Sequence, residues 1–345
     1  MSLRDEMFEQ PEVALRLLDR SRDTIAALAD VLRRRRPTFV LIAARGSSDH
    51  AALYAQYLFA IRNAIPVALA TPSAFTYYGA RPRLDGALVL GISQSGRSPD
   101  IVAVLEEAAR QGSMTLAITN EPSAPLARTA DHVIEIQAGV EEATAATKTY
   151  TAELLAVALL STALDAATAD ESTALAAVSG WMAAALEADA DADRLATQHA
   201  SMTRCIVLGR GYEYATAREW ALKLQEMTQV LAVPYSAADF AHGPLALAEA
   251  ALPVLAVASS GPPLDAQIGM LRELRERHHA PMLVISDSED ALGLDHGLRV
   301  PSGVAEWLAP LVSIIPAQLF AYHLAAAKGL DTERPRTITK VTRTR

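Results

Sequence analysis

The sequence is poor in the residues that hold disulfides and metals. It has one cysteine, Cys205, among 345 residues. A single cysteine excludes an intramolecular disulfide, and because Cys205 lies in the apolar run 205–208 we expect a buried, unreactive thiol. The eight histidines are scattered, and the pair His278 and His279 has no further ligand at helical or CxxC-like spacing. We therefore expect no metal and no cofactor.

Basic charge and long apolar segments are also scarce. A formal net charge of -9 at pH 7 argues against nucleic acid or an anionic membrane as the main partner. The only concentrated basic run, 33–36, ends an amphipathic N-terminal helix before Pro37, where cations suit the helix dipole. No apolar run approaches the roughly 18 residues of a membrane span, and charges interrupt positions 4–9, so no signal peptide is predicted. A cytoplasmic protein follows as an expectation.

One plan of strand-like runs occurs twice along the chain. The run 39–44 ends at Arg45-Gly46, and the run 205–209 ends at Arg210-Gly211 at a matching distance into the second half. The segments 87–96 and 114–120 also have counterparts, at 253–261 and 281–287. Short apolar strands alternating with helical segments predict an α/β fold with parallel sheets covered on both faces.

The repeated plan predicts two tandem doubly wound parallel-sheet domains related by internal duplication. The boundaries we expect are an N-terminal helix at 1–36, a first domain at 37–165, linking helices at 166–199, a second domain at 200–328 and a C-terminal tail at 329–345. A disordered, low-complexity linker is the alternative for the Ala-rich segment between the domains.

The segment GISQSGRSPD, residues 91–100, lies between a strand-like and a helical run. Hydroxyl and amide side chains gather there, a glycine lets the backbone approach a ligand, and the next helix offers unpaired N–H groups. This predicts a phosphate site, with an ordinary Ser-rich helix cap as the alternative. In the second copy, two prolines follow Ser259, Ser260 and Gly261. The phosphate site is therefore expected in the first copy only. The candidate ligands are Ser93, Gln94, Ser95 and Ser98.

Several longer motifs together resemble the sugar isomerase (SIS) family over essentially the whole chain. The motifs are EQP (9–11), RGSS (45–48), SQSG (93–96), TK (147–148), LGRGYEYATAREWALKLQE (208–226), AHGPLAL (241–247) and KGLDTERPRTITK (328–340). Within the family, the resemblance is to the isomerase half of glutamine:fructose-6-phosphate aminotransferases. It implies two flavodoxin-like SIS domains and a phosphorylated amino sugar, a hexosamine 6-phosphate, as the ligand.

The glutaminase domain that supplies ammonia to those synthases has no counterpart here, since the α/β pattern begins near residue 37. The chain thus resembles SIS-type glucosamine-6-phosphate deaminases, which release ammonia and fructose 6-phosphate. Two alternatives stay open within the enzymes: a fructosamine-6-phosphate deglycase and a deaminase for another amino-sugar phosphate. A non-catalytic sugar-phosphate-binding regulator is the alternative from another class.

The resemblance assigns the phosphate to the SQSG loop, assisted by Gly46, Ser47 and Ser48. The chain departs from the family's pattern at two places. Arg45 stands where the synthases have a cysteine, and Ala146 replaces a serine that contacts the sugar. Thr144 and Ala146, in the segment 142–146 that departs from the family's pattern, remain candidates for binding the substrate.

An isomerisation needs a base, and residue spacing offers one in Glu226. It lies three positions after Lys223 on a predicted helix, so the lysine can hold its carboxylate or an enolamine oxygen. A solvated helix charge is the alternative. His242, in Ala-His-Gly-Pro, is of the residue type that suits proton transfer in ring opening; a capping or surface histidine is its alternative. By resemblance, His242 reaches a neighbouring subunit, which implies a homodimer with shared active sites.

Lys340 lies near the end of the chain, in a tail without apolar periodicity. The tail alone would predict a solvated lysine. The resemblance instead places this amine in the active site, where it can form a Schiff base with an open-chain ketose. In the deaminase direction, Lys340 is expected to assist ring opening and imine exchange.

Overall fold

The computed structural model describes residues 2–165, 168–336 and 339–340. Their contacts divide them into two compact units. The first unit comprises residues 12–141, 148–176 and 339–340, and the second comprises 2–11, 142–147 and 177–336. The C-terminal tail predicted at 329–345 includes 337–338 and 341–345, which lie outside the described residues.

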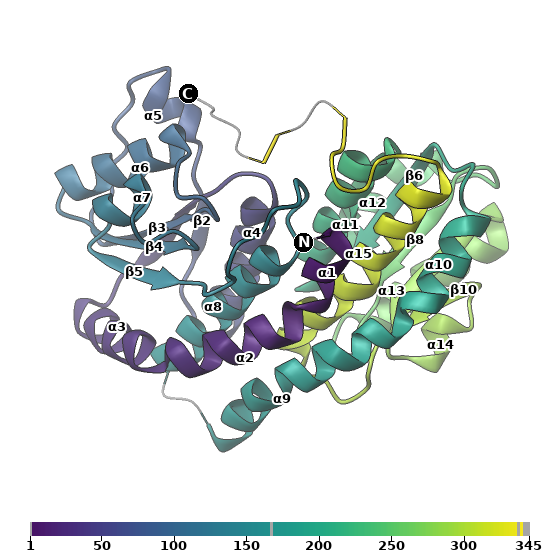
Figure 1. Ribbon diagram of the computed structural model, residues 1–345, viewed down its shortest axis with the longest axis horizontal. Helices are drawn as coiled ribbons and strands as arrows, with labels where there is room; N and C mark the ends of the chain where they lie inside the picture. The colour runs from purple at the N-terminus through teal and green to yellow at the C-terminus, as the bar shows by residue number, and fades with distance from the viewer. Residues whose placement is uncertain (1, 166–167, 337–338, 341–345) are drawn as a thin grey trace. The chain divides into compact units, whose positions relative to one another are not determined.

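A five-stranded parallel sheet forms the centre of the first unit, with strand order β2-β1-β3-β4-β5 (Figure 1). The central pairing aligns Ile42 with Leu90. The chain crosses from β2 past β1 to β3, so a switch point lies between β1 and β3, where ligands bind in such sheets. The strands are β1 (Phe39–Ala43), β2 (Val67–Leu69), β3 (Ala87–Ile92), β4 (Met114–Thr119) and β5 (His132–Glu135).

Helices cover this sheet because its strands are apolar on both sides; every residue of β3 is buried. Residues of α6 and α7, including Leu105 and Leu126, pack with Val89 and Ala117 of the sheet in one core cluster. The helices of the first half of the chain are α1 (Leu3–Phe8), α2 (Gln10–Arg20), α3 (Arg22–Arg35), α4 (Ser47–Arg62), α5 (Pro72–Thr76), α6 (Pro99–Arg110), α7 (Pro125–Thr129) and α8 (Lys148–Leu164).

The N-terminal segment forms three helices, α1 to α3, where the sequence predicts one. Ser2 and Asp5 form a capping box that starts α1, and Glu9 ends it. Arg33, Arg34 and Arg35 occupy the last turn of α3, and Arg36 ends that helix in the left-handed region. The basic run is thus at a helix C-terminus, where cations stabilise the dipole.

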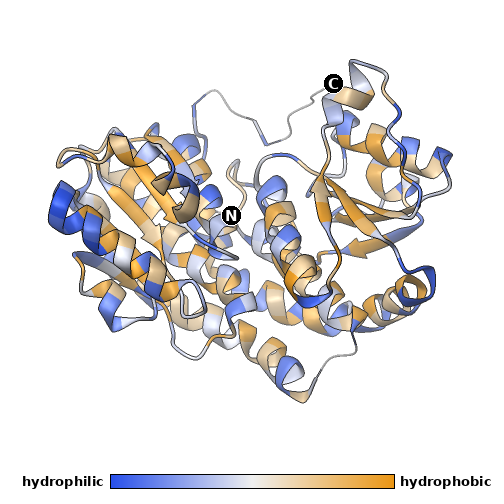
Figure 2. Cartoon of the chain, turned by 180° about the vertical axis from the view of Figure 1, so that it is seen from behind, coloured by the Kyte–Doolittle hydropathy of each residue, from blue (hydrophilic) through white to orange (hydrophobic). Residues whose placement is uncertain are grey.

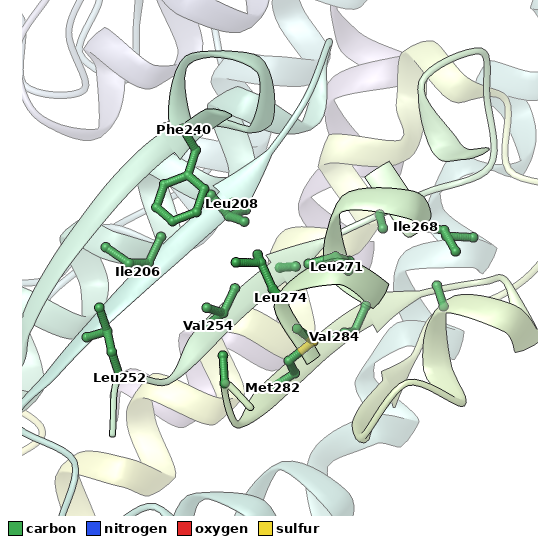
Figure 3. Packing of buried hydrophobic residues seen from close by; sticks show 14 residues of the cluster. Ile206, Leu208, Phe240, Leu252, Val254, Ile268, Leu271, Leu274, Met282 and Val284 are labelled. Atoms are coloured by element: carbon green, nitrogen blue, oxygen red, sulfur yellow. The ribbon is translucent and has the colours of Figure 1, made fainter. Parts of the chain in front are cut away.

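The second unit repeats the topology, with strand order β10-β9-β8-β6-β7. The duplicated, doubly wound α/β fold is confirmed by these two sheets, and hydrophobic residues dominate the strands of both (Figure 2). In the core, residues of β6, β8 and β9 pack with residues of α12 and α13, Phe240 and Leu271 among them (Figure 3). The strands are β6 (Arg204–Gly209), β7 (Leu231–Ser236), β8 (Val254–Val257), β9 (Met282–Ser286) and β10 (His296–Arg299).

Helices also form where the sequence predicts a linking segment. They are α9 (Ala169–Ala185), η1 (Leu186–Ala188) and α10 (Asp189–Gln198). The remaining helices are α11 (Glu213–Thr228), α12 (Ala237–Ala241), η2 (Pro244–Leu247), α13 (Leu264–His278), α14 (Glu289–Leu292), η3 (Glu306–Leu308) and α15 (Ala309–Ala327).

One helical segment corrects the expectation that no apolar run approaches the length of a membrane span. Among the described residues, Glu306–Ala327 is a 22-residue helical stretch with a mean hydropathy of 1.5, and 89% of its apolar window is buried inside the fold. It contacts α10 and α11. Isolated polar residues such as Gln318 interrupt its apolar sequence, and Gln318 accepts a 2.9 Å hydrogen bond from Gln10. This burial is that of a core helix.

Candidate active site

The predicted phosphate loop connects β3 to α6 at the carboxyl end of the first sheet. The hydroxyl oxygen of Ser93 accepts a 3.2 Å hydrogen bond from the N–H of Gly96 and closes the loop. Gly96 has a φ of 60°, and a Cβ there would lie 2.6 Å from the Cβ of Ala124, so the turn requires glycine. Ser98 is the N-cap residue of α6, but its hydroxyl makes no capping bond with the described residues. The Ser98 hydroxyl thus lies at the start of α6 without a capping bond to the described residues.

The second loop of the switch point, residues 45–48, leads from β1 into α4. Gly46 is the N-cap residue, with a φ of 58°. Ser48 is buried and donates a 2.9 Å hydrogen bond to Oε1 of Glu153 on α8. The structure thus directs the Ser48 hydroxyl proton to a carboxylate of the protein, an interaction that the sequence did not predict.

Arg45 connects the two loops through an ion pair with Asp100. The Nε atom of Arg45 lies 2.9 Å from Oδ2 of Asp100, which is fully buried in the first turn of α6. The other carboxylate oxygen accepts a 3.0 Å hydrogen bond from the N–H of Ile101. The guanidinium of Arg45 thus offsets the charge of Asp100 at the start of α6.

A pocket of about 460 Å³ opens beside the phosphate loop in the first unit, and Gln94, Ser95 and Lys340 all line it. The Nζ atom of Lys340 lies 2.5 Å from Oε2 of Glu141, a buried carboxylate. Glu141 also accepts hydrogen bonds of 3.2 Å and 2.7 Å from the N–H and hydroxyl of Thr149. Lys340 is thus held in the pocket of the phosphate loop, and sequence reasoning missed the acid that holds it.

The candidate base belongs to a buried cluster on α11 of the second unit. As the spacing predicts, Lys223 and Glu226 share one helix face, with Nζ 2.6 Å from Oε2 of Glu226. Lys223 is buried and also lies 3.4 Å from Oε1 of the buried Glu219. The Glu226 side chain keeps 23% of its surface exposed. A fixed cation thus orients a carboxylate that remains accessible.

His242 and the segment 142–147 also belong to the second unit. His242 is exposed at the C-terminal end of α12, where its N–H donates a 3.0 Å hydrogen bond to the carbonyl of Asp239. Thr144 and Ala146 are half-buried. Their segment is fixed by the buried Glu6, which accepts a 3.3 Å hydrogen bond from the N–H of Ala143.

In the second copy, the loop at 259–261 is the counterpart of the predicted phosphate loop. One of its serines is bonded to a carboxylate of the protein. Glu213, at the start of α11, accepts hydrogen bonds from the hydroxyls of Ser259, Thr216 and Ser313. Burial raises the pKa of the Glu213 carboxyl. Since Ser259 is bonded to this acid, the structure supplies a physical reason to expect phosphate binding in the first copy alone.

The fold defines a class of protein with two tandem doubly wound domains. In the first domain, a loop that turns at Gly96 carries hydroxyl side chains beside a pocket lined by cationic residues. The chain belongs to the SIS domain family, whose model matches residues 32–163 and 200–328. It is homologous to the isomerase, C-terminal, half of glutamine–fructose-6-phosphate aminotransferase. With that enzyme of Methanothermobacter thermautotrophicus it shares 34% identity over 337 residues, which cover 97% of this chain and 56% of the relative. The chain spans about half the length of the curated relatives it matches.

Two solved structures agree with this assignment. A protein of Silicibacter pomeroyi DSS-3, described only provisionally as a phosphosugar isomerase, has a TM-score of 0.88 and 35% identity, covering 96% of this chain and 100% of its own. The C-terminal domain of glucosamine-fructose-6-phosphate aminotransferase from Francisella tularensis has a TM-score of 0.83 and 27% identity. That match covers 95% of this chain and 97% of the other.

Proposed function

We propose that this protein is an amino-sugar-phosphate isomerase of the deaminase type. It takes glucosamine 6-phosphate and water to fructose 6-phosphate and ammonia. The observation that carries the proposal is the pair on α11, in which buried Lys223 holds the accessible carboxylate of Glu226 at 2.6 Å. The kinship with the isomerase half of the aminotransferases supports the choice of an amino-sugar phosphate.

The substrate's phosphate binds at the loop between β3 and α6. The hydroxyls of Ser95 and Ser98 and the amide of Gln94 supply hydrogen bonds, and the N-terminus of α6 supplies its dipole. Because Arg45 neutralises Asp100 in the first turn of that helix, the site remains favourable for a dianion. The far end of the sugar is then free to react.

Glu226 moves the proton in the isomerisation. Its carboxylate takes the proton from C2 of the open-chain aldehyde while O1 gains a proton, which leaves an enolamine. The carboxylate then returns its proton to C1 while the nitrogen loses one, which replaces the proton that O1 gained. This gives an alcohol at C1 and an imine at C2. Water adds to the imine, the C–N bond breaks, and ammonia leaves a ketone at C2. Lys223 keeps the carboxylate oriented throughout.

His242 and Lys340 serve ring opening. The imidazole of His242 carries a proton between the ring oxygen and O1. The amine of Lys340 assists ring opening and imine exchange, and Glu141, 2.5 Å away, holds it in the pocket. The exposure of His242 supports the proposal that it acts in the active site of a neighbouring subunit. The enzyme is then a homodimer with shared active sites. Its proposed location is the cytoplasm.

The test is an assay of the purified chain with glucosamine 6-phosphate. We expect ammonia and fructose 6-phosphate in equal amounts. Galactosamine 6-phosphate and fructosamine 6-phosphates, run as a panel, decide among related amino-sugar substrates. A raised melting temperature with fructose 6-phosphate but no turnover of any member would contradict the enzyme and favour a regulator.

A further inference from the structure

We propose that the pocket beside the phosphate loop contains a second anionic subsite, built by Arg16, Arg20 and Arg97, which binds a carboxylate or phosphate group at the far end of the sugar. This inference rests on the proposed function, since it concerns the substrate class of that same site. The three arginines line the 460 Å³ pocket that also exposes Gln94, Ser95 and Lys340.

Gln137 holds two of these arginines. Its carbonyl oxygen accepts a 2.7 Å hydrogen bond from Nε of Arg16, and its amide oxygen lies 3.3 Å from a terminal nitrogen of Arg20. Gln137 has a φ of 55°, a left-handed conformation that costs a non-glycine residue energy and is concentrated at functional sites. One residue just after β5 thus orients two guanidinium groups. Each guanidinium has five N–H donors, and the bond to Gln137 uses one of them.

Arg97 lies in the phosphate loop itself, next to Gly96. Its side chain is exposed and makes no hydrogen bond or ion pair within the described part of the chain. The hydrogen bonds of Ser123, together with the charge of Arg97, lower the pKa of Glu121 on the pocket's rim. Arg97 therefore adds a cation whose guanidinium donors are not used by the described residues.

The side chains that line the pocket have a net positive charge, which favours an anionic ligand. Four cationic side chains line the pocket against three carboxylates, Glu121, Glu135 and Glu141. Glu141 is bonded to Lys340 and Thr149. The wall 137–141 is also fixed, since Asn120 donates a 2.7 Å hydrogen bond to the carbonyl of Gly139. Guanidinium forks of this kind match carboxylate and phosphate oxygens.

The sheet separates Gln137, which holds Arg16 and Arg20, from the phosphate loop, which carries Arg97. The loop follows β3, whereas Gln137 follows β5, and β4 lies between them. Neighbouring strands lie about 4.8 Å apart, so the two ends of the pocket are roughly 10 Å apart. One phosphate cannot reach both ends. A sugar phosphate with an anionic group at its C1 or C2 end can, with its reacting carbons near Lys340.

Calorimetric titrations with the full chain test the subsite. The probes are fructose 6-phosphate, fructose 1,6-bisphosphate and the 6-phosphorylated fructosyl adduct of glycine, whose carboxylate replaces the second phosphate. We expect at least one doubly anionic probe to bind about 10-fold or more tightly than fructose 6-phosphate. The gain should disappear in R16Q/R20Q, with fructose 6-phosphate affinity unchanged, and it should shrink in R97Q. Arg34→Gln, an exposed arginine on α3, is the matched control and should keep the gain.

Two outcomes would overturn the subsite: equal affinities for all three probes, or a gain that survives both R16Q/R20Q and R97Q. Melting temperatures of the variants separate lost binding from lost folding, and R97Q removes no side-chain hydrogen bond or ion pair made with the described residues. A wild-type chain that binds fructose 6-phosphate but gains nothing from a second anion refutes the subsite alone. A chain that binds none of the probes refutes the phosphate site on which the proposed function depends.

Discussion

The Nζ atom of Lys223 lies 2.6 Å from Oε2 of Glu226, and the lysine is buried whereas the carboxylate is partly exposed. The cation is thus fixed by the core, and the base that it orients remains within reach of a ligand. Glu219 lies on the other side of the ammonium group, at 3.4 Å. A lysine between two acids can be buried because both carboxylates compensate its charge.

Removing that cation should destabilise the protein. In Lys223→Met, two carboxylates lose their shared positive partner, one of them in the core, and we expect a loss of about 3–5 kcal/mol in the free energy of unfolding. Urea denaturation measures it. Glu219→Gln added to Lys223→Met should recover part of the loss. A single variant as stable as the wild type would show that the ion pair does not hold this helix face.

Arg45 should affect substrate binding more than chemistry. Arg45→Gln leaves the charge of buried Asp100 uncompensated beside the phosphate loop, and we expect KM for the sugar phosphate to rise about 10-fold with a smaller change in kcat. Steady-state kinetics measure both constants. The double variant R45Q/D100N removes the repulsion and should bring KM back toward the wild-type value. Equal KM values for the single and double variants would contradict the electrostatic explanation.

Cys205 should be inert in the folded protein. Burial on β6 raises the pKa of its thiol to about 12. Only the thiolate reacts, so at pH 8 the native protein should react with a disulfide reagent roughly 1000-fold more slowly than the urea-unfolded chain. The release of the chromophoric thiol gives both rates. Similar rates for the two states would mean that this strand opens readily.

Glu213 should make stability depend on pH. Burial raises the pKa of its carboxyl above the ordinary 4.5, so the folded state binds this proton more tightly than the unfolded state. Its contribution to stability is therefore fully present below pH 4.5 and is lost as the pH rises through the folded-state pKa. Thermal unfolding of Glu213→Gln beside the wild type tests this.

The difference in unfolding free energy between E213Q and the wild type should change with pH in one direction. From pH 4.5 to pH 8, the difference in the free energy of unfolding should move in favour of E213Q. At the exposed Glu187, the same substitution should show no such trend. A difference that is constant with pH would show that the burial of Glu213 carries no proton linkage.

The sequence predicted the strands that belong to the internal duplication, where apolar strand runs alternate with helical segments. The predicted strand runs that begin at residues 39, 87 and 205 appear as β1, β3 and β6. Shorter strands escaped notice because their signals are weak. β2 has three residues, and β7 contains Pro234, which a strand accepts at the edge of a sheet.

The candidate site was predictable only where residues lie close in sequence. Lys223 and Glu226 could be paired because three positions on a helix bring side chains together. Glu141 and Lys340 are separated by 199 positions, and no local pattern connects them. Arg16 and Gln137 are similarly distant, so the cationic part of the pocket required the tertiary structure.

The most direct test of the central claim is ammonia release from glucosamine 6-phosphate by the wild type and by Glu226→Gln. The substitution keeps the size of the side chain and its place beside Lys223 but removes the base. We expect the rate to fall about 100-fold to 10,000-fold while the melting temperature and fructose 6-phosphate binding stay unchanged. A variant that folds, binds and still releases ammonia at nearly the wild-type rate would contradict the assignment of Glu226 as the base.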